Sequence, residues 1–250
     1  MEQHRIVSNE EWLTARRALL AEEKAFTHAR DALAAQRQTL PWVRVDKTYT
    51  FDTPQGKRTL ADLFDGRSQL IVYHFMLGPD WEEGCRGCSF VSDHIDGTIA
   101  HLEHHDVSYV AVSRAPLAKL EAFKKRMGWH FRWVSSNQSD FNFDYHVSFS
   151  EEDKAKGKVE YNFTEQNYES DEMPGASVFF KDEKGDIFHT YSTYARGLDM
   201  ALTTYVLLEL TPKGRNEQNG MLDWMRHHDR YEDAASAKAG GCCSEMSHAK

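Results

Sequence analysis

Apolar residues recur at helical spacing near the start of the chain. Between residues 10 and 40 the sequence has neither glycine nor proline. Ser8 and Glu11 have the spacing of an N-terminal capping box, and Pro41 ends the pattern. Large apolar residues repeat every seven positions: Trp12, Leu19, Phe26, Leu33 and Leu40. The pattern predicts one long helix, whose apolar stripe is covered either by the rest of this chain or by a second copy in a homodimer.

The next part of the chain alternates short apolar strands with helical patterns. Near-continuous apolar runs, as at residues 69–76, are typical of central strands covered on both faces. A turn at residues 182–186 separates two short strands of a hairpin. The expected strands are 49–51, 69–76, 107–112, 131–134, 177–180 and 187–191, and the expected core helices are 91–102, 117–123 and 198–210.

This element order predicts an α/β fold with a mixed central sheet and helices on both faces. Right-handed crossovers make the early strands parallel, and the hairpin adds antiparallel strands. The thioredoxin fold is the common small architecture with this order. We expect an N-terminal helical extension at 1–41 and a thioredoxin-like domain at 42–212, with an irregular insertion at about 135–172. A polar extension at 213–250 ends in a loose tail.

Composition narrows the classes of partner. The chain has 250 residues, 40% of them hydrophobic and 28% charged, which is enough to bury a sizeable core. A net charge of −9 argues against binding to nucleic acid or to an anionic membrane surface. The longest apolar run, residues 70–77, is too short to cross a bilayer, and the N-terminus shows no secretory signal. We therefore expect a cytoplasmic location.

The sharpest chemical feature is the pair Cys85 and Cys88, which encloses Arg86 and Gly87. The pair follows a buried strand and a short loop, where a helix is expected to begin. A helix N-terminus stabilises a thiolate, and Arg86 adds a positive charge. We expect Cys85 to be the attacking thiol, with a pKa below about 8.5. Cys88 is then the more buried resolving thiol. The sequence predicts thiol–disulfide exchange with a thiol or disulfide substrate, either a protein or a small molecule, without a cofactor.

Two other functions remain open at this stage. Cys85, Cys88 and the distant His189 form a candidate site for copper or zinc, although no second C-x-x-C pair completes a zinc site. Alternatively, the aromatic residues of the loops line a cleft, and the protein is a redox-inactive binding module. Cys242 and Cys243 lie in the tail, where a free thiol pair or soft-metal binding is more plausible than a strained disulfide between neighbours.

Longer segments carry a family resemblance. They are Leu40-Pro41-Trp42, Phe64-Asp65-Gly66-Arg67, Tyr73-His74-Phe75-Met76, Asp80-Trp81, Gly84-Cys85, Ser113-Arg114-Ala115-Pro116, Arg126-Met127-Gly128-Trp129, Asp140-Phe141-Asn142 and the run 189–197. From about Trp12 to Pro212 the chain resembles a bacterial thioredoxin-like family of unknown function, generally described as predicted dithiol–disulfide oxidoreductases. The resemblance implies the fold and the redox chemistry, but not the substrate.

The resemblance also adds expectations about the surroundings of the dithiol. In thioredoxin-like proteins a cis-proline faces the dithiol, and Pro174 stands at that position just before a predicted strand. We expect it to bind substrate, together with Trp81 and Arg86. A peroxiredoxin motif places proline and then threonine ahead of the reactive cysteine. Here Pro79 precedes Cys85 by six residues with no threonine between them, which argues against a peroxidase.

Two residues are candidates for supporting roles. His74 interrupts the strand that leads to Cys85, so it is either a hydrogen-bonded core residue or a group that tunes the thiolate or accepts a proton. Arg114 lies in one of the resembling segments. The run His227-His228-Asp229 is interpreted as a solvated helix end, with metal ligation as the alternative.

Overall fold

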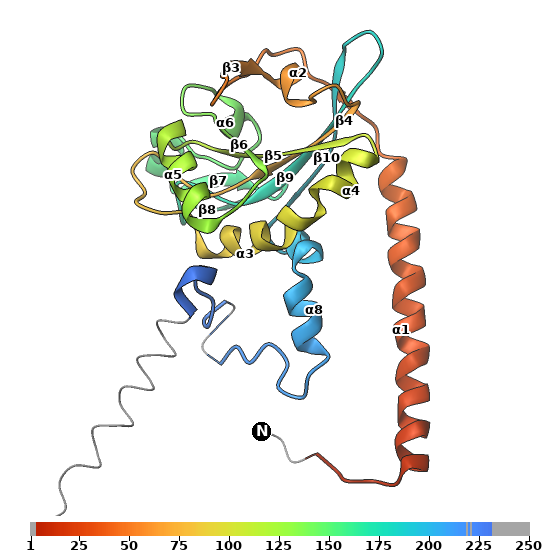
Figure 1. The fold of residues 1–250 in the computed structure, drawn as a ribbon. Coiled ribbons are helices and arrows are strands. Elements are labelled where there is room, and N and C mark those ends of the chain that lie inside the picture. The colour runs from red at the N-terminus through yellow and green to blue at the C-terminus, as the bar shows by residue number, and fades with distance from the viewer. Residues whose placement is uncertain (1–3, 219, 221, 232–250) are drawn as a thin grey trace, which may run out of the picture. The chain divides into compact units, whose positions relative to one another are not determined.

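A computed structural model describes residues 4–218, 220 and 222–231. The chain divides into two units, Met1–Val43 and Arg44–Lys250, which are described separately (Figure 1). The first unit is the helix α1 (Asn9–Gln38). Its N-terminus has the predicted capping box, in which Ser8 and Glu11 satisfy each other's backbone N–H groups. Among residues 4–43, the described part of this unit, no side chain is buried, and the homodimer through α1 stays a prediction.

The second unit is built on a mixed sheet with strand order β10-β9-β4-β5-β6-β2-β3. Its centre is parallel and consists of β4 (Gln69–His74), β5 (Val107–Ser113) and β6 (Arg132–Ser135). The apolar runs predicted for these strands are buried, because layers of side chains cover both faces of the central strands. The C-terminal end of β4 therefore lies in the middle of the sheet, and the dithiol loop starts there.

Antiparallel strands complete the sheet on both sides. The predicted hairpin is β9 (Gly175–Lys181) and β10 (Ile187–Tyr194), with β9 antiparallel to β4. The other edge is a second hairpin, β2 (Thr50–Thr53) and β3 (Gly56–Thr59), of which the sequence predicted only the first strand. The short strand β1 (Val43–Arg44) stands where the two units meet in the sequence.

Helices cover both faces of the sheet, as predicted. The helices α3 (Arg86–Ile95) and α5 (Leu117–Met127) share one apolar core with the sheet, and α2 (Leu60–Leu63) and α6 (Phe141–Asp144) share the other (Figure 1). The helix α4 (Ile99–His104) continues α3 after the 3₁₀ turn η1 (Asp96–Thr98) and packs on the α3 side. A thioredoxin-like α/β fold is thereby confirmed.

The insertion between β6 and β9 is more regular than expected. It contains α6, α7 (Glu151–Lys156) and a separate hairpin of β7 (Lys158–Tyr161) and β8 (Thr164–Asn167). Aromatic and β-branched residues of this segment that gave no clear periodicity, Val147, Phe149, Val159 and Tyr161, form a small core together with Tyr194 of β10. The expectation of an irregular segment at 135–172 is corrected, because short elements carry too few turns to show a period.

The helix expected at 198–210 is also divided. The chain forms the 3₁₀ helix η2 (Ala195–Ala201), turns at Leu202, and continues as α8 (Thr203–Glu209). The last described element is the 3₁₀ turn η3 (His228–Arg230). Cys242 and Cys243 lie outside the described residues. Among the residues that the structure describes, no helix has both the length and the hydropathy that a membrane span requires.

Gly175 tests the packing of the sheet centre. A Cβ atom there would lie 2.7 Å from Cδ1 of the buried Tyr194, whereas a Cβ on Gly97 would meet nothing within 4 Å. We expect Gly175→Ala to lower the free energy of unfolding by about 1–3 kcal/mol through overpacking. The control Gly97→Ala should show no loss. Urea unfolding measures both, and equal midpoints for the two variants would contradict this account of the core.

Candidate dithiol site

The fold places both cysteines at the N-terminus of α3, as the sequence predicts. Cys85 is the N-cap residue, and Cys88 lies in the first turn. The Cys85 N–H donates to the Met76 carbonyl at 3.0 Å, which ties the motif back to the start of the loop that follows β4. Glycine is required at position 84, because a Cβ there would lie 2.7 Å from the Phe75 ring. This close approach fixes the motif against the core.

Several groups stabilise the thiolate of Cys85. A hydrogen bond from the Cys88 thiol lowers the pKa of Cys85 most, whereas burial of the side chain raises it. The backbone N–H groups of Cys88 and Gly87 and the charge of Arg86 lower the pKa further. The net result is a pKa of about 6, compared with an ordinary value of 9.0. At pH 7, about nine-tenths of a thiol with a pKa near 6 is ionised, whereas only about one-hundredth of a thiol with a pKa of 9 is ionised. The side chain is only half-buried, so this thiolate can reach a substrate.

Cys88 is the opposite kind of thiol. It is buried, and it accepts a hydrogen bond from the Met76 N–H at 3.4 Å. Burial, and then the neighbouring Cys85 sulfur, raise the pKa of Cys88 well above its ordinary value. The pair therefore shares one proton, which stays on Cys88 while Cys85 is ionised. This asymmetry suits Cys85 to attack first and Cys88 to act second.

Tyr73 is a neighbour of the dithiol that the sequence did not reveal. Its side chain is buried on the α3 face of the sheet, and its hydroxyl makes no hydrogen bond of ordinary geometry. The hydroxyl faces Cys88, and its interaction with that thiol lowers the pKa of Cys88 against the larger effect of burial. Tyr73 is thus the polar group best placed to help Cys88 lose its proton.

A cavity of about 270 Å³ opens beside the two sulfur atoms. Pro174 lines it together with Cys85, so the structure brings the predicted proline to the dithiol. However, no cis peptide bond occurs among the described residues, and the expectation of a cis Met173–Pro174 bond is corrected. The remaining lining is almost entirely apolar and comes from β4, α3, η2, α8 and the C-terminal part of the chain.

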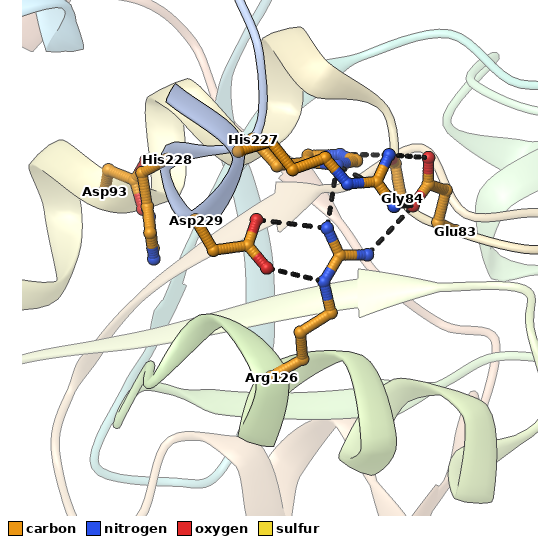
Figure 2. Close-up of polar contacts among 8 residues, drawn as sticks. Glu83, Gly84, Asp93, Arg126, His227, His228 and Asp229 are labelled. Carbon is orange, nitrogen blue, oxygen red and sulfur yellow. Dashed lines mark hydrogen bonds and ion pairs between the residues drawn. The ribbon is translucent and has the colours of Figure 1, made fainter. Parts of the chain in front are cut away.

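That C-terminal part, residues 222–231, is called the C-terminal segment here. His227 is buried in it, and its Nε2–H donates to the carbonyl of Gly84 at 2.9 Å, one residue before Cys85 (Figure 2). Arg126 of α5 lies 3.3 Å from His227 Nδ1 and also bonds Asp229 and Glu83 (Figure 2). The expectation of a solvated helix end at 227–229 is therefore wrong for His227, which docks on the dithiol loop.

The C-terminal segment also touches the motif itself. Arg86 donates from Nη1 to the Met225 carbonyl at 3.2 Å, so its side chain spans from α3 to the segment. A Cβ built on Gly87 would lie 3.4 Å from Cδ1 of Leu222 and 3.8 Å from the Cys85 sulfur. Leu222 therefore lies over the middle of the C-x-x-C turn, and glycine at 87 leaves room for it.

His74 is not at the dithiol. Alternation along β4 sends Tyr73 to the α3 face and His74 to the opposite face, where it stacks on Tyr145. His74 Nε2 lies 2.9 Å from the Ser177 hydroxyl. Burial, and then the charge of His189, lower the pKa of His74 to about 3, so the ring is neutral near pH 7. The core-residue alternative for His74 agrees with the structure.

His189 belongs to the same buried network and not to a metal site with the cysteines. Its Nε2 lies 2.8 Å from the hydroxyl of Ser192, which in turn lies 2.9 Å from the hydroxyl of Ser177. Among the described residues, no group of three histidine, cysteine or carboxylate side chains is arranged to hold a metal ion. The structure does not bring Cys85, Cys88 and His189 together.

Trp81 and Arg114 lie in another recess. They line a separate, polar pocket of about 250 Å³ between the dithiol loop and α7. Arg114 forms a 3.0 Å ion pair with Glu172, whose carboxylate is buried and also accepts from Ser148. Burial raises the pKa of Glu172 to about 7, against the effects of Ser148 and Arg114. Arg114 thus holds the insertion to the end of β5 and does not line the dithiol cavity.

Comparison with known proteins gives a family. Residues 1–231 match the family described as bacterial protein of unknown function, DUF899, so the chain belongs to it. This confirms the resemblance drawn from the sequence. No protein of curated function matches. Similar solved structures include peroxidoxin BcpB from Mycobacterium tuberculosis, with 14% identity and a TM-score of 0.43 over 66% of this chain and 95% of that one. Another is the mitochondrial 2-cys peroxiredoxin from Plasmodium falciparum, with 13% identity and a TM-score of 0.39 over 73% and 98%.

The pKa of Cys85 can be measured by alkylation. In a protein lacking the tail cysteines, we expect the alkylation rate of Cys85 to rise with a midpoint near pH 6, resolved from Cys88 by peptide mass mapping. The pKa of Cys85 is lower in the folded protein than in the unfolded chain. The Cys85 thiolate therefore stabilises the folded state fully above pH 9, and this contribution is lost as the pH falls through 6. Arg86→Ala should raise the midpoint by less than about one pH unit, since its charge is screened. Arg44→Ala is the control, and a midpoint at 9 would contradict this assignment.

Tyr73→Phe tests the second thiol. Removing the hydroxyl leaves Cys88 harder to ionise, so closure of a Cys85 mixed disulfide should slow by about two- to tenfold, which corresponds to the loss of a polar interaction of about 0.4–1.4 kcal/mol. Tyr109→Phe is the control, because it removes another buried hydroxyl that makes no hydrogen bond. Release of the leaving thiol is followed by absorbance. Equal closure rates in the two variants would show that Tyr73 does not act on Cys88.

Proposed function

We propose that the protein is a dithiol–disulfide oxidoreductase. The observation that carries the proposal is the asymmetry of the pair: an accessible Cys85 with a lowered pKa, and a buried Cys88 with a raised one. Structural thiols buried in a core have no need of this difference, whereas exchange requires one thiolate and one protonated partner.

The reaction has two steps. The Cys85 thiolate attacks one sulfur of a substrate disulfide, forms a mixed disulfide and releases the first substrate thiolate. Cys88 then attacks the Cys85 sulfur, closes the Cys85–Cys88 disulfide and releases the second thiolate, which takes up the proton that Cys88 loses. Two electrons pass from the protein to the substrate, and no bound cofactor takes part.

The helix N-terminus supports the first step in both directions. Its backbone N–H groups stabilise the negative charge on Cys85 when it attacks and again when Cys85 leaves the mixed disulfide in the reverse direction. In the cytoplasm, the location that the sequence predicts, small thiols would return the disulfide to the dithiol. Exchange is therefore reversible, and the supply of reductant sets its direction.

Single-cysteine variants test this proposal. In a background with Cys242→Ser and Cys243→Ser, a mild disulfide oxidant should convert the wild-type pair to an internal disulfide that dithiothreitol reverses. Cys88→Ser should instead accumulate a mixed disulfide on Cys85, because no resolving thiol remains. Cys85→Ser should react at least about tenfold more slowly, because Cys88 is buried and protonated.

Metal analysis of the same samples tests the two alternatives to the redox proposal. If both thiols stay free under the oxidant and copper or zinc co-purifies in proportion to protein, the redox proposal is wrong and the dithiol binds metal. If the thiols stay free and no metal is present, the protein uses its cavity for binding without redox chemistry. Either result overturns the proposal.

A further inference from the structure

The opening at the dithiol is small and apolar. The cavity of about 270 Å³ is below the common range of about 300–1,000 Å³ for pockets that hold drug-sized ligands. Its walls include Phe90, Leu198, Leu202 and Tyr205, and the Cys85 sulfur lies at its edge. A compound that reaches Cys85 through this cavity must therefore be small and must give up water on most of its surface.

Charged groups at the cavity are already paired. Arg196 and Asp199 line it and form an ion pair of 2.9 Å with each other. Arg86, the other nearby cation, donates to the Met225 carbonyl. Each of these groups therefore already has a partner of its own, and an ion that enters the apolar part of the cavity would lose hydration that the lining does not replace.

The C-terminal segment covers the motif on the remaining side. Leu222 lies over Gly87, and Met225 lines the cavity. The segment is held in place by His227 on Gly84 and by the Arg126–Asp229 pair, whose two bonds measure 2.8 and 3.0 Å (Figure 2). Glu83 joins the same network through Arg126 and Arg230. A protein disulfide needs a broad exposed face around Cys85, and the C-terminal segment narrows that face at Arg86 and Gly87.

From these observations we propose that the substrate of the dithiol is a small, uncharged, apolar disulfide, which binds in the cavity between α3, α8 and the C-terminal segment. This rests on the proposed exchange function and adds the substrate class. Cys85 attacks one sulfur of the bound compound, and Cys88 resolves, so one disulfide yields two small thiols and an oxidised protein. Folded proteins and charged disulfides are excluded by the cover and by the lining, respectively.

Two aromatic disulfides of similar shape provide the test. Dithiodipyridine is uncharged, and dithiobis(nitrobenzoate) carries two carboxylates. Each reacts in single-turnover mode with the pre-reduced protein lacking Cys242 and Cys243, at high ionic strength to screen the overall acidic charge. Each rate constant is divided by that of the free peptide spanning Gly84–Ser89, which corrects for intrinsic reactivity. The normalised rate should favour the uncharged compound by about tenfold or more, and insulin disulfides should not be reduced.

Matched variants locate the selectivity. Leu222→Asp places a carboxylate at the cavity, which repels the dianionic compound more than the uncharged one, and should increase the preference for the uncharged compound at least about threefold. Leu207→Asp makes the same change on an exposed position of α8 outside the cavity and should leave it unchanged. Arg126→Ala loosens the C-terminal segment and should allow insulin reduction. Lys47→Ala, which breaks ion pairs with Asp140 and Asp144 elsewhere, should not.

The outcomes separate this inference from the proposed function. If all three disulfides oxidise the protein in proportion to their reaction with the peptide, exchange stands and the substrate class is wrong. If selectivity exists but Leu222→Asp and Leu207→Asp behave alike, the cavity is not its source, and the inference also fails. If no disulfide oxidises the pair, both the inference and the proposed function fail.

Discussion

The chemistry of this protein depends on one shared proton between Cys85 and Cys88. The hydrogen bond from the Cys88 thiol is the largest stabilising influence on the Cys85 thiolate, and burial of Cys88 keeps the proton on that side. The arrangement requires that α3 begin at Cys85, because the first-turn N–H groups then point to the sulfur. The sheet core, the tight approach at Gly84 and the loop after β4 all serve to hold this helix end in place.

The residues that surround Cys85 and Cys88 are determined by which helices cover each face of the sheet. One face of β4 packs under α3 and α5 and supplies Tyr73 to the dithiol. The other face carries His74 into a closed network with Ser177 that makes no contact with the cysteines. The adjacent residues Tyr73 and His74 thus lie on opposite faces of β4 and have different roles. Tyr73 faces the dithiol, and His74 belongs to a buried hydrogen-bond network that supports the fold.

Much of this was predictable from local sequence. The apolar run of β4, followed by a short loop and C-x-x-C, indicated both the fold and the position of Cys85 at a helix start. The roles of His74 and Tyr73 were not predictable in the same way, because alternation assigns them to opposite faces without telling which face α3 covers. His227 contacts a residue 143 positions earlier in the chain, and no local pattern reports such a contact. Leu222 and Met225 of the same C-terminal segment line the cavity, so its full lining was not predictable either.

The most direct test of the shared proton compares two substitutions of Cys88. Serine keeps a hydrogen-bond donor beside Cys85, and alanine removes it, while both leave the helix N-terminus and Arg86 unchanged. Thiolate absorbance in the ultraviolet, measured against pH in a protein without the tail cysteines, reports Cys85 alone in each variant. The account predicts a midpoint that stays well below 9 in Cys88→Ser and rises clearly in Cys88→Ala. Equal midpoints in the two variants would show that the proton of residue 88 does not control Cys85.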